Sequence, residues 1–212
     1  MCDEKSLILK QSKINDELRQ QLCNHPFFQT PIYSLENQNT FIKDHSRSEY
    51  DLAILQFLEN QQYDYSNYCV EYWFQKYDNT HTLGLFPHCD YNDVYRNSLG
   101  NIPNDWPHKE DLSLVVSPIT IVVYLEIPED MQGGELNISR RTWYEEEFPI
   151  LAWDSIKQYP FDTITPRQGS VIYFKGSDHY HWVNPVTNGH RKSLIINFWT
   201  PNKNGFRNPC FE

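Results

Sequence analysis

Residues 67–200 consist mainly of short runs of β-branched and aromatic residues separated by turn signals. Such runs are typical of strands, and about seven or eight of them follow a helical N-terminal part. The predicted strands cover residues 68–77, 82–90, 112–126, 135–139, 169–174, 179–183 and 191–199. We expect the strand at 82–90 to pair with the strand at 68–77. Helices followed by many short strands indicate a mainly β fold, an antiparallel sandwich or jelly roll.

The first 66 residues are expected to form helical support for this β-rich part. Residues 14–22 form a short amphipathic stretch. Ser48 resembles an N-cap, and the helix that follows it should end near Gln61. Because there is no internal repeat, linker or second core, we expect a single domain over residues 1–212, with residues 67–200 as the jelly-roll core.

The charge of the chain limits its partners. It has 18 Lys and Arg against 28 Asp and Glu, a net charge of −10. An acidic protein without a basic stripe repels phosphate backbones, so we expect no nucleic-acid partner. No apolar stretch reaches the length of a membrane span, and residues 1–5 do not begin a secretory signal. The cysteines are odd in number and lack a C-x-x-C pair, which favours reduced thiols and a cytoplasmic location.

His88 and Asp90 form an H-x-D triplet at the end of a predicted strand. Residues i and i+2 of a strand point to the same face, so these two side chains should project together. A distant strand must supply any third ligand, and His181 has a suitable position before Pro185 and Gly189. Two histidines and one carboxylate are the facial triad that holds non-haem Fe(II) and leaves positions open for chemistry.

Each of these residues also has an ordinary structural interpretation. An isolated H-x-D triplet arises often by chance, and a single histidine is more often structural than a ligand. His179 is the main rival for the third ligand, since it shares a strand face with His181. The remaining histidines have no matching context and are expected to be exposed; they are His25, His45, His81, His108 and His190.

An arginine follows His181 at a fixed offset, in the string H-x-V-x-P-V-x-x-G-x-R that ends at Arg191. Arginine is always charged and binds carboxylates through two parallel hydrogen bonds. The strand after Arg191 is apolar, and a buried arginine requires a partner. Ser193 lies on the same strand face and could add a hydroxyl donor.

Several motifs occur in a fixed order along the chain. The H-x-D triplet precedes a Val- and Ile-rich strand that ends in Tyr124-Leu125, and then come Gly133-Gly134-Glu135-Leu136, residues 169–174 and the string from His181 to Arg191. This order resembles the 2-oxoglutarate/Fe(II)-dependent dioxygenases, particularly their prolyl-hydroxylase-like branch, over roughly residues 70–200. The resemblance implies a double-stranded β-helix, which is a distorted, cupin-like jelly roll.

The resemblance also implies a set of ligands. Fe(II) would be bound by His88, Asp90 and His181, and O2 would react at the iron. The cosubstrate 2-oxoglutarate would be bound by Arg191 and Ser193. Tyr124 could donate its hydroxyl to the same carboxylate.

The implied activity is hydroxylation of a C–H bond with release of succinate and CO2. We expect a small polar or amino-acid-like substrate. One alternative is a peptide or protein side-chain hydroxylase of the same superfamily, and the others are a cupin-type metal protein that does not use 2-oxoglutarate and a non-catalytic binding module. Residues 91–110 should form a loop over the iron that contributes to specificity. The sequence does not indicate an oligomeric state.

Three departures separate this chain from other branches of the superfamily. Nucleic-acid demethylases carry a second arginine six residues after the first, where this chain has Asn197. Halogenating members lose the triad carboxylate, whereas Asp90 is present here. Many prolyl-hydroxylase-like members bind the cosubstrate through lysine rather than an arginine such as Arg191, which weakens any assignment of proline as the substrate.

Overall fold

The protein is mainly β in the part that the computed structural model describes. That part comprises residues 7–29, 40–42, 48–65, 69–80, 84–90, 119–142 and 156–199. In chain order the elements are β1 (Ile8–Lys13), α1 (Asp16–Cys23), the 3₁₀ helix η1 (Pro26–Gln29), β2 (Thr40–Phe41), α2 (Glu49–Asn60), β3 (Cys69–Asp78), β4 (Leu85–His88), β5 (Thr120–Glu126), β6 (Gln132–Gly133), β7 (Leu136–Thr142), β8 (Phe161–Ile164), β9 (Ser170–Phe174), β10 (His179–Val183), β11 (Val186–Asn188) and β12 (His190–Trp199).

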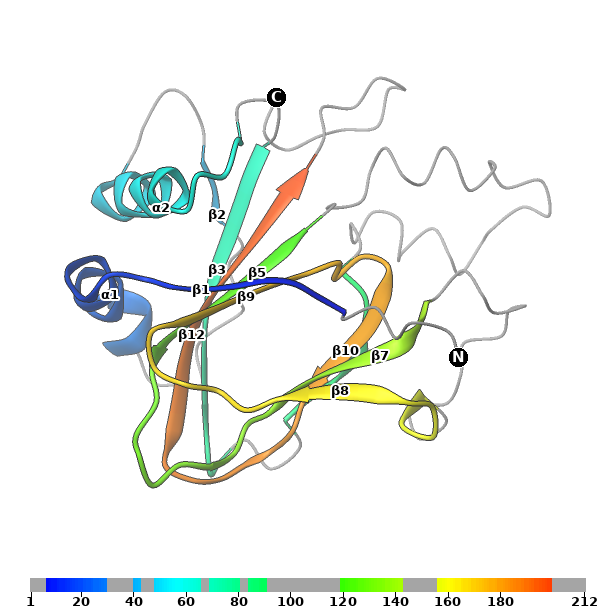
Figure 1. Cartoon of the computed structure of the whole chain (residues 1–212). Helices are drawn as coiled ribbons and strands as arrows, with labels where there is room; N and C mark the ends of the chain where they lie inside the picture. The colour runs from blue at the N-terminus through cyan, green and yellow to red at the C-terminus, as the bar shows by residue number, and fades with distance from the viewer. Residues whose placement is uncertain are drawn as a thin grey trace, which may run out of the picture.

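Two antiparallel sheets form the body of the molecule. The larger has six strands in the order β1-β9-β5-β12-β3-β2, and the smaller has four in the order β4-β10-β7-β8. A short ribbon of β11 and β6 joins them at one end. Figure 1 shows α1 and α2 on one side of the large sheet and the small sheet on its other side. This arrangement is a distorted jelly roll, so the predicted fold class is confirmed.

The large sheet buries both of its faces, and the alternation of side chains along its strands separates two cores. Leu194 and Ile196 of β12 belong to the core between the sheet and the helices. Ile195 of β12 and Tyr124 of β5 belong to the core between the two sheets. We call these faces the helix face and the inner face of the large sheet.

Helix α2 begins with the capping box that the sequence predicts. Ser48 accepts a hydrogen bond from the backbone N–H of Asp51, and the Asp51 side chain accepts one from the backbone of Ser48. Asp51 is buried, and its side chain also accepts a hydrogen bond of 2.9 Å from the Tyr72 hydroxyl on β3. The cap therefore fixes α2 to the sheet and satisfies the first N–H groups of the helix.

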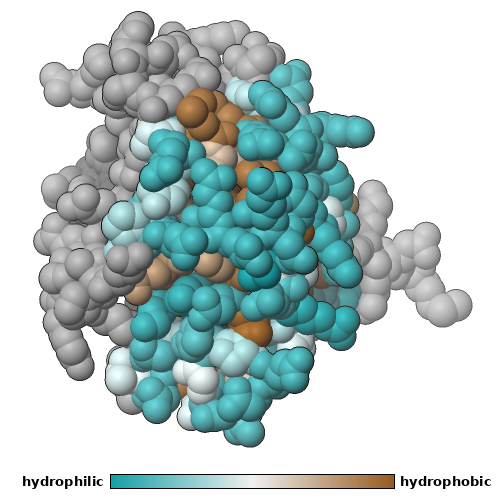
Figure 2. Space-filling view, turned by 90° about the vertical axis from the view of Figure 1, so that its left-hand side faces the viewer, coloured by the Kyte–Doolittle hydropathy of each residue, from teal (hydrophilic) through white to brown (hydrophobic). Residues whose placement is uncertain are grey.

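The surface on the helix side is polar. Figure 2 shows the side of the molecule that carries α1 and α2; its described residues are mostly hydrophilic, and hydrophobic ones form only small separate patches.

Neither α1 nor α2, the α-helices of the described ranges, is long and apolar enough to cross a membrane.

The N-terminal part is not purely helical, which corrects the prediction for residues 1–66. β1 pairs with β9 and β2 pairs with β3, so both strands extend the large sheet. β1 carries mostly polar, exposed side chains. As an edge strand it is held by backbone hydrogen bonds rather than by an apolar face, so hydrophobic periodicity does not reveal it.

The strand pairing also differs from the prediction. Strand β4, within the predicted strand 82–90, pairs with β10 of the small sheet, whereas β3 pairs with β12 and β2. A jelly roll pairs strands that are distant in sequence, so neighbouring predicted strands are a poor guide to its pairing. Strand β8 lies in a segment without a strand prediction, and residues 91–118, including the predicted substrate loop, lie outside the described residues.

Candidate metal and cosubstrate site

His88, Asp90 and His181 come together at the open edge of the small sheet. Antiparallel pairing of β4 with β10 places His88 opposite His181. Asp90 follows two residues after His88, just past the end of β4, and its backbone N–H donates to the Gly176 carbonyl at 2.9 Å. Within the described residues this is the group of His, Cys, Asp and Glu whose ligand atoms lie close enough to hold a metal ion, all within 4.8 Å of one another.

The two imidazoles present the same nitrogen to Asp90. The distance from Nε2 to Asp90 Oδ1 is 3.7 Å for His88 and 3.6 Å for His181. The Nδ1 atoms face backbone carbonyls, that of Phe86 at 2.8 Å and that of His179 at 3.1 Å. Because a carbonyl can only accept, each Nδ1 donates to its backbone partner, and Nε2 is the nitrogen turned toward Asp90. The backbone thus holds each ring with Nε2 available to a metal.

Asp90 is held as a carboxylate. The side chain is buried, and Thr120 of β5 donates a hydrogen bond to Oδ2 at 2.5 Å. Burial alone raises the pKa of this carboxyl, but the nearby His181, His88 and the Thr120 hydroxyl lower it more, so that it lies well below its ordinary value. Thr120 occupies Oδ2 and leaves Oδ1 facing the imidazoles.

Gly176 provides the room that Asp90 needs. A Cβ atom at this position would lie 2.2 Å from Asp90 Oδ2 and 2.2 Å from Thr120 Oγ1. Both are rigidly placed, so neither could move aside without breaking the hydrogen bond between them. Nothing in the sequence singles out Thr120 or Gly176, because neither belongs to the motifs that carry the proposed ligands.

His179 lies beside the group but is turned to the neighbouring strand. Its Nδ1 is 3.0 Å from the Ser139 carbonyl on β7. The geometry thus supports the predicted preference for His181 over His179. Of the other histidines, His25 and His190 are half-buried rather than fully exposed. The His25 ring stacks on Phe74 with centroids 4.1 Å apart, and the His190 ring contacts Glu126. His45, His81 and His108 lie outside the described residues.

Arg191, at the start of β12, is buried with 1% of its surface exposed. Its Nε donates to Ser193 Oγ at 2.9 Å and its Nη1 donates to the Gly134 carbonyl at 2.9 Å. The guanidinium lies 4.8 Å from the ring centroid of Tyr124 and 5.7 Å from that of Tyr77. None of its contacts among the described residues is with a carboxylate, so the positive charge is uncompensated within that part of the chain.

Tyr124 adds an unused donor beside this charge. Its hydroxyl oxygen is buried and has no hydrogen-bond partner in the part of the chain that the structure describes. Burial raises the pKa of Tyr124, and it raises the pKa of Tyr77 to about 12, so both phenols stay protonated. A buried guanidinium and an unpaired phenol fit an anionic ligand that accepts hydrogen bonds. The carboxylate of 2-oxoglutarate is such a ligand, and Arg191, Ser193 and Tyr124 lie close together as the sequence predicts.

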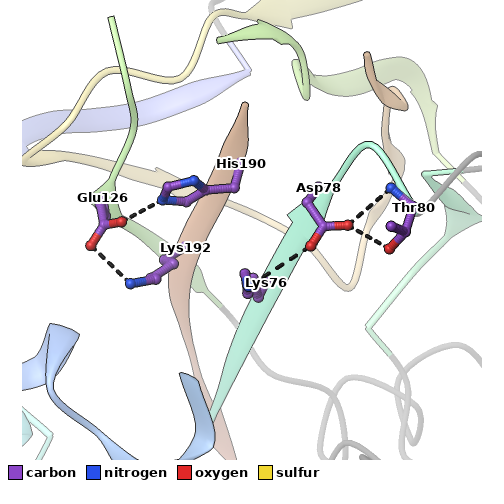
Figure 3. Close-up of polar contacts among 6 residues, drawn as sticks. All are labelled: Lys76, Asp78, Thr80, Glu126, His190 and Lys192. Atoms are coloured by element: carbon purple, nitrogen blue, oxygen red, sulfur yellow. Dashed lines mark hydrogen bonds and ion pairs between the residues drawn. The ribbon is translucent and has the colours of Figure 1, made fainter. Parts of the chain in front are cut away.

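The strand ends around Arg191 are fastened by ion pairs (Figure 3). Glu126 of β5 accepts a hydrogen bond from Lys192 Nζ at 2.9 Å and contacts the His190 ring with its other oxygen. On the other side of β12, Lys76 Nζ lies 3.8 Å from Asp78 on β3. The two contacts of Glu126 hold the residues on both sides of Arg191, so its side chain enters the inner core from a fixed backbone.

Comparison with known proteins agrees with this geometry. The family described as "2OG-Fe(II) oxygenase superfamily" matches residues 72–200, more than half of the chain. A prolyl-4-hydroxylase from Pseudomonas putida has a similar fold, with a TM-score of 0.53 and 17% identity over 93% of this chain and 87% of that one. The 2-oxoglutarate complex of the viral collagen prolyl hydroxylase from Paramecium Bursaria Chlorella virus-1 has a TM-score of 0.52 and 17% identity over 95% and 99%.

No curated protein sequence is significantly similar to this chain. The likeness to the two hydroxylases, at this identity, concerns the fold, and it agrees with the expected prolyl-hydroxylase-like architecture. The family assignment rests on the match over residues 72–200, which spans the triad and Arg191. The chain therefore belongs to the 2OG-Fe(II) oxygenase superfamily and is a 2-oxoglutarate-dependent oxygenase that uses Fe(II), 2-oxoglutarate and O2.

Proposed function

We propose that this oxygenase hydroxylates a C–H bond of an amino-acid-like substrate at an iron held by His88, Asp90 and His181. The observation that carries the proposal is the convergence of two Nε2 atoms on one carboxylate oxygen, at 3.7 and 3.6 Å. Two histidines and one carboxylate would hold Fe(II) and leave coordination positions free for the cosubstrate and oxygen. The retained carboxylate of Asp90 favours transfer of a hydroxyl group rather than a halide.

The chain's own residues bind and orient the reactants. Arg191, Ser193 and Tyr124 bind the distal carboxylate of 2-oxoglutarate, and the inner core around them excludes water. With Fe(II) bound, 2-oxoglutarate and O2 supply the oxidation that turns C–H into C–OH while the cosubstrate becomes succinate and CO2. Asp90 stays ionised, and the backbone contacts of the two Nδ1 atoms keep both Nε2 atoms turned toward the place where the metal would bind.

The substrate is proposed to be an amino-acid residue, within a peptide or free. The structural neighbours act on prolyl groups according to their names, and one is a collagen hydroxylase. These names support a peptide, which the sequence analysis treated as the alternative to a small metabolite. Arg191 stands where many such enzymes have lysine, so proline itself is not assigned. A cupin that does not use 2-oxoglutarate is disfavoured by the family match.

An anaerobic titration tests the metal and cosubstrate parts together. Fe(II) and 2-oxoglutarate are added to the protein, and the weak visible charge-transfer band of the chelate is recorded. We expect the band in the wild type and in His179→Ala, and no band in His181→Ala. A band in His181→Ala together with none in His179→Ala would assign the third ligand to the other histidine.

A substrate panel tests the reaction. Succinate release is measured with free amino acids, with peptides and with oligonucleotides, and products are examined by mass for the gain of one oxygen atom. We expect turnover with peptides or amino acids. The net charge of −10 predicts none with oligonucleotides. Turnover with a methylated oligonucleotide alone would refute the proposed substrate class.

A further inference from the structure

Asn197 lies on the inner face of the large sheet, six residues after Arg191 on the same strand. Leu194, Ile196 and Phe198 of β12 pack in the core of the helix face, and Ile195 packs in the inner core. Strand alternation therefore places Asn197 on the same face as Arg191. It is 2% exposed, so its amide is directed into the space between the sheets.

The strand register puts Asn197 at the level of the metal site. Its Cα partner on β5 is Thr120, and its partner on β3 is Glu71. Thr120 is the residue that donates to Asp90, the proposed carboxylate ligand. Residues directly opposite on neighbouring antiparallel strands have Cβ atoms only about 4.5–5.5 Å apart. Asn197 is thus one side chain away from the group that orients Asp90.

The Oδ1 atom of Asn197 is buried and has no hydrogen-bond partner among the described residues. Asn137 of β7, which is 1% exposed, shows the usual state of a buried amide. Its Nδ2 donates to Asn184 at 3.0 Å and its Oδ1 accepts from Thr163 at 2.8 Å. A buried polar group without a partner calls for an explanation, and here the adjacent metal site supplies one.

The polar side chains around Asn197 on the inner face indicate which kind of group could form a hydrogen bond with its amide. Asn197 presents a carbonyl oxygen, and the neighbouring side chains Glu71 and Asp90 are buried acids with 4% and 8% exposure. The guanidinium that binds an anion belongs to Arg191, at the other end of the strand. The unpaired Oδ1 can only accept, so a group that donates a hydrogen bond can complete it.

We infer that Asn197 determines specificity by accepting a hydrogen bond from an N–H group of the primary substrate, next to the C–H bond that is oxidised. This inference rests on the proposed function. An amide N–H of a peptide, or the amino group of an amino acid, has the required chemistry. Asn197 then acts on the primary substrate, whereas Arg191 acts on the cosubstrate.

The first test compares two buried asparagines in the protein without ligands. Asn197→Leu removes an amide oxygen that has no partner among the described residues, so the melting temperature should stay the same or rise. Asn137→Leu breaks the hydrogen bonds of Asn137 with Glu135, Asn184 and Thr163 and should lower it. If Asn197→Leu lowers the melting temperature as much as Asn137→Leu does, then Asn197 has a structural role and the inference is wrong.

The second test measures binding and turnover separately. Asn197→Leu should keep the visible band with Fe(II) and 2-oxoglutarate at unchanged cosubstrate affinity. The KM for the peptide or amino acid found with the substrate panel should rise at least about tenfold, the effect of one lost hydrogen bond of 1.4 kcal/mol or more. An unchanged KM, or a loss of 2-oxoglutarate affinity instead, would overturn the inference.

The third test identifies the donor by a cycle between enzyme and substrate. Analogues of that substrate are prepared with each N–H methylated in turn. One analogue should bind the wild type about as weakly as the parent substrate binds Asn197→Leu, and methylation should cost nothing further in that variant. Additive losses for every analogue would contradict the contact. A wild type without the visible band and without succinate release would instead refute the proposed function.

Discussion

The two faces of the large sheet are equally buried but differ in kind. On the helix face, β12 contributes Leu194, Ile196 and Phe198, and each has none of its surface exposed. On the inner face the same strand contributes Arg191 and Asn197, which are 1% and 2% exposed. Among the described residues, the Tyr124 hydroxyl and Asn197 Oδ1 of the inner face are buried without a hydrogen-bond partner, whereas the core of the helix face is built from apolar and aromatic side chains. One strand thus supplies apolar packing on one side and, under the proposed function, ligand-binding residues on the other.

This division follows from the period of a strand. Because successive side chains alternate, a ligand-binding row costs the helix face nothing in packing. A helix that supplied the same residues would spread them over a face that it also uses for its core contacts. The two faces should therefore respond to mutation in opposite ways, and variants of neighbouring residues can test the division.

The largest effect is expected at the triad of His88, Asp90 and His181. Asp90→Ala removes a ligand, its charge and the acceptor of the Thr120 hydrogen bond. Stoichiometric Fe(II) binding and turnover should be abolished while the circular-dichroism spectrum stays that of a folded protein. His179→Ala is the matched control and should retain both. Full Fe(II) binding by Asp90→Ala would show that the metal site lies elsewhere.

On the helix face, Leu194→Ala should act on stability alone. Leu194 is fully buried, and truncation of such a leucine costs about 2–5 kcal/mol of unfolding free energy because it leaves a cavity. Urea denaturation measures this loss. The folded fraction should bind Fe(II) and 2-oxoglutarate with wild-type affinity. A comparable loss of 2-oxoglutarate affinity at full folding would show that the two faces are coupled.

Arg191 lies three residues before Leu194 on β12, and its replacement should have the opposite effect. Arg191→Ala should lower the affinity for 2-oxoglutarate rather than the stability of the fold. It removes the cation that the cosubstrate carboxylate requires, and loss of one partner of a buried charge pair costs about 2–5 kcal/mol of binding. Isothermal titration with 2-oxoglutarate in the presence of Mn(II) measures it. Metal affinity itself should survive. Unchanged 2-oxoglutarate affinity would show that Arg191 is a structural residue.

The sequence predicted the residues of the candidate site better than the residues that surround them. His88 and Asp90 lie in one short motif, and His181 and Arg191 lie in another, so they could be recognised without coordinates. The alternation along residues 191–199 also follows from the sequence. The predicted roles of these residues as ligands stay predictions.

The supporting residues could not be predicted in the same way. Thr120 meets Asp90 only because β5 lies in the other sheet, and the steric role of Gly176 depends on a turn that packs against both. The orphaned amide of Asn197 becomes visible only when all of its neighbours are placed. In the sequence, Asn197 stands out only because nucleic-acid demethylases have an arginine at this position. The structure shows in addition that its buried Oδ1 has no hydrogen-bond partner among the described residues.

Gly176→Ala should produce a smaller effect, on the metal only. The added Cβ would clash with both Asp90 and Thr120, so Asp90 must turn away from the two imidazoles. Loss of such support around a metal ligand costs about 10–100-fold in metal affinity. Ser177→Ala, at the next residue, is the control, because the Ser177 hydroxyl contacts Asp178 instead. Equal metal affinity in both variants would mean that the turn adapts.

The smallest effect is expected at the margin of β12, outside both cores. Burial raises the pKa of Glu126, but hydrogen bonds from Lys192 and His190 lower it more, so the net shift is downward from 4.5. A carboxyl whose pKa is lower in the folded state stabilises the protein above its unfolded pKa, and this contribution disappears as the pH falls through the folded pKa. About a third of the Glu126 side chain is exposed, which limits the contribution to less than about 1 kcal/mol.

Glu126→Gln tests this expectation through the pH dependence of unfolding. The variant should be slightly less stable than the wild type near neutral pH, and the difference should shrink as the solution is made acidic below the ordinary pKa of glutamate. Urea denaturation of both proteins across this range measures it. A difference that stays constant with pH would show that packing, not charge, explains the effect. The affinity for 2-oxoglutarate should change little, because Glu126 holds the residues beside Arg191 and does not contact its guanidinium.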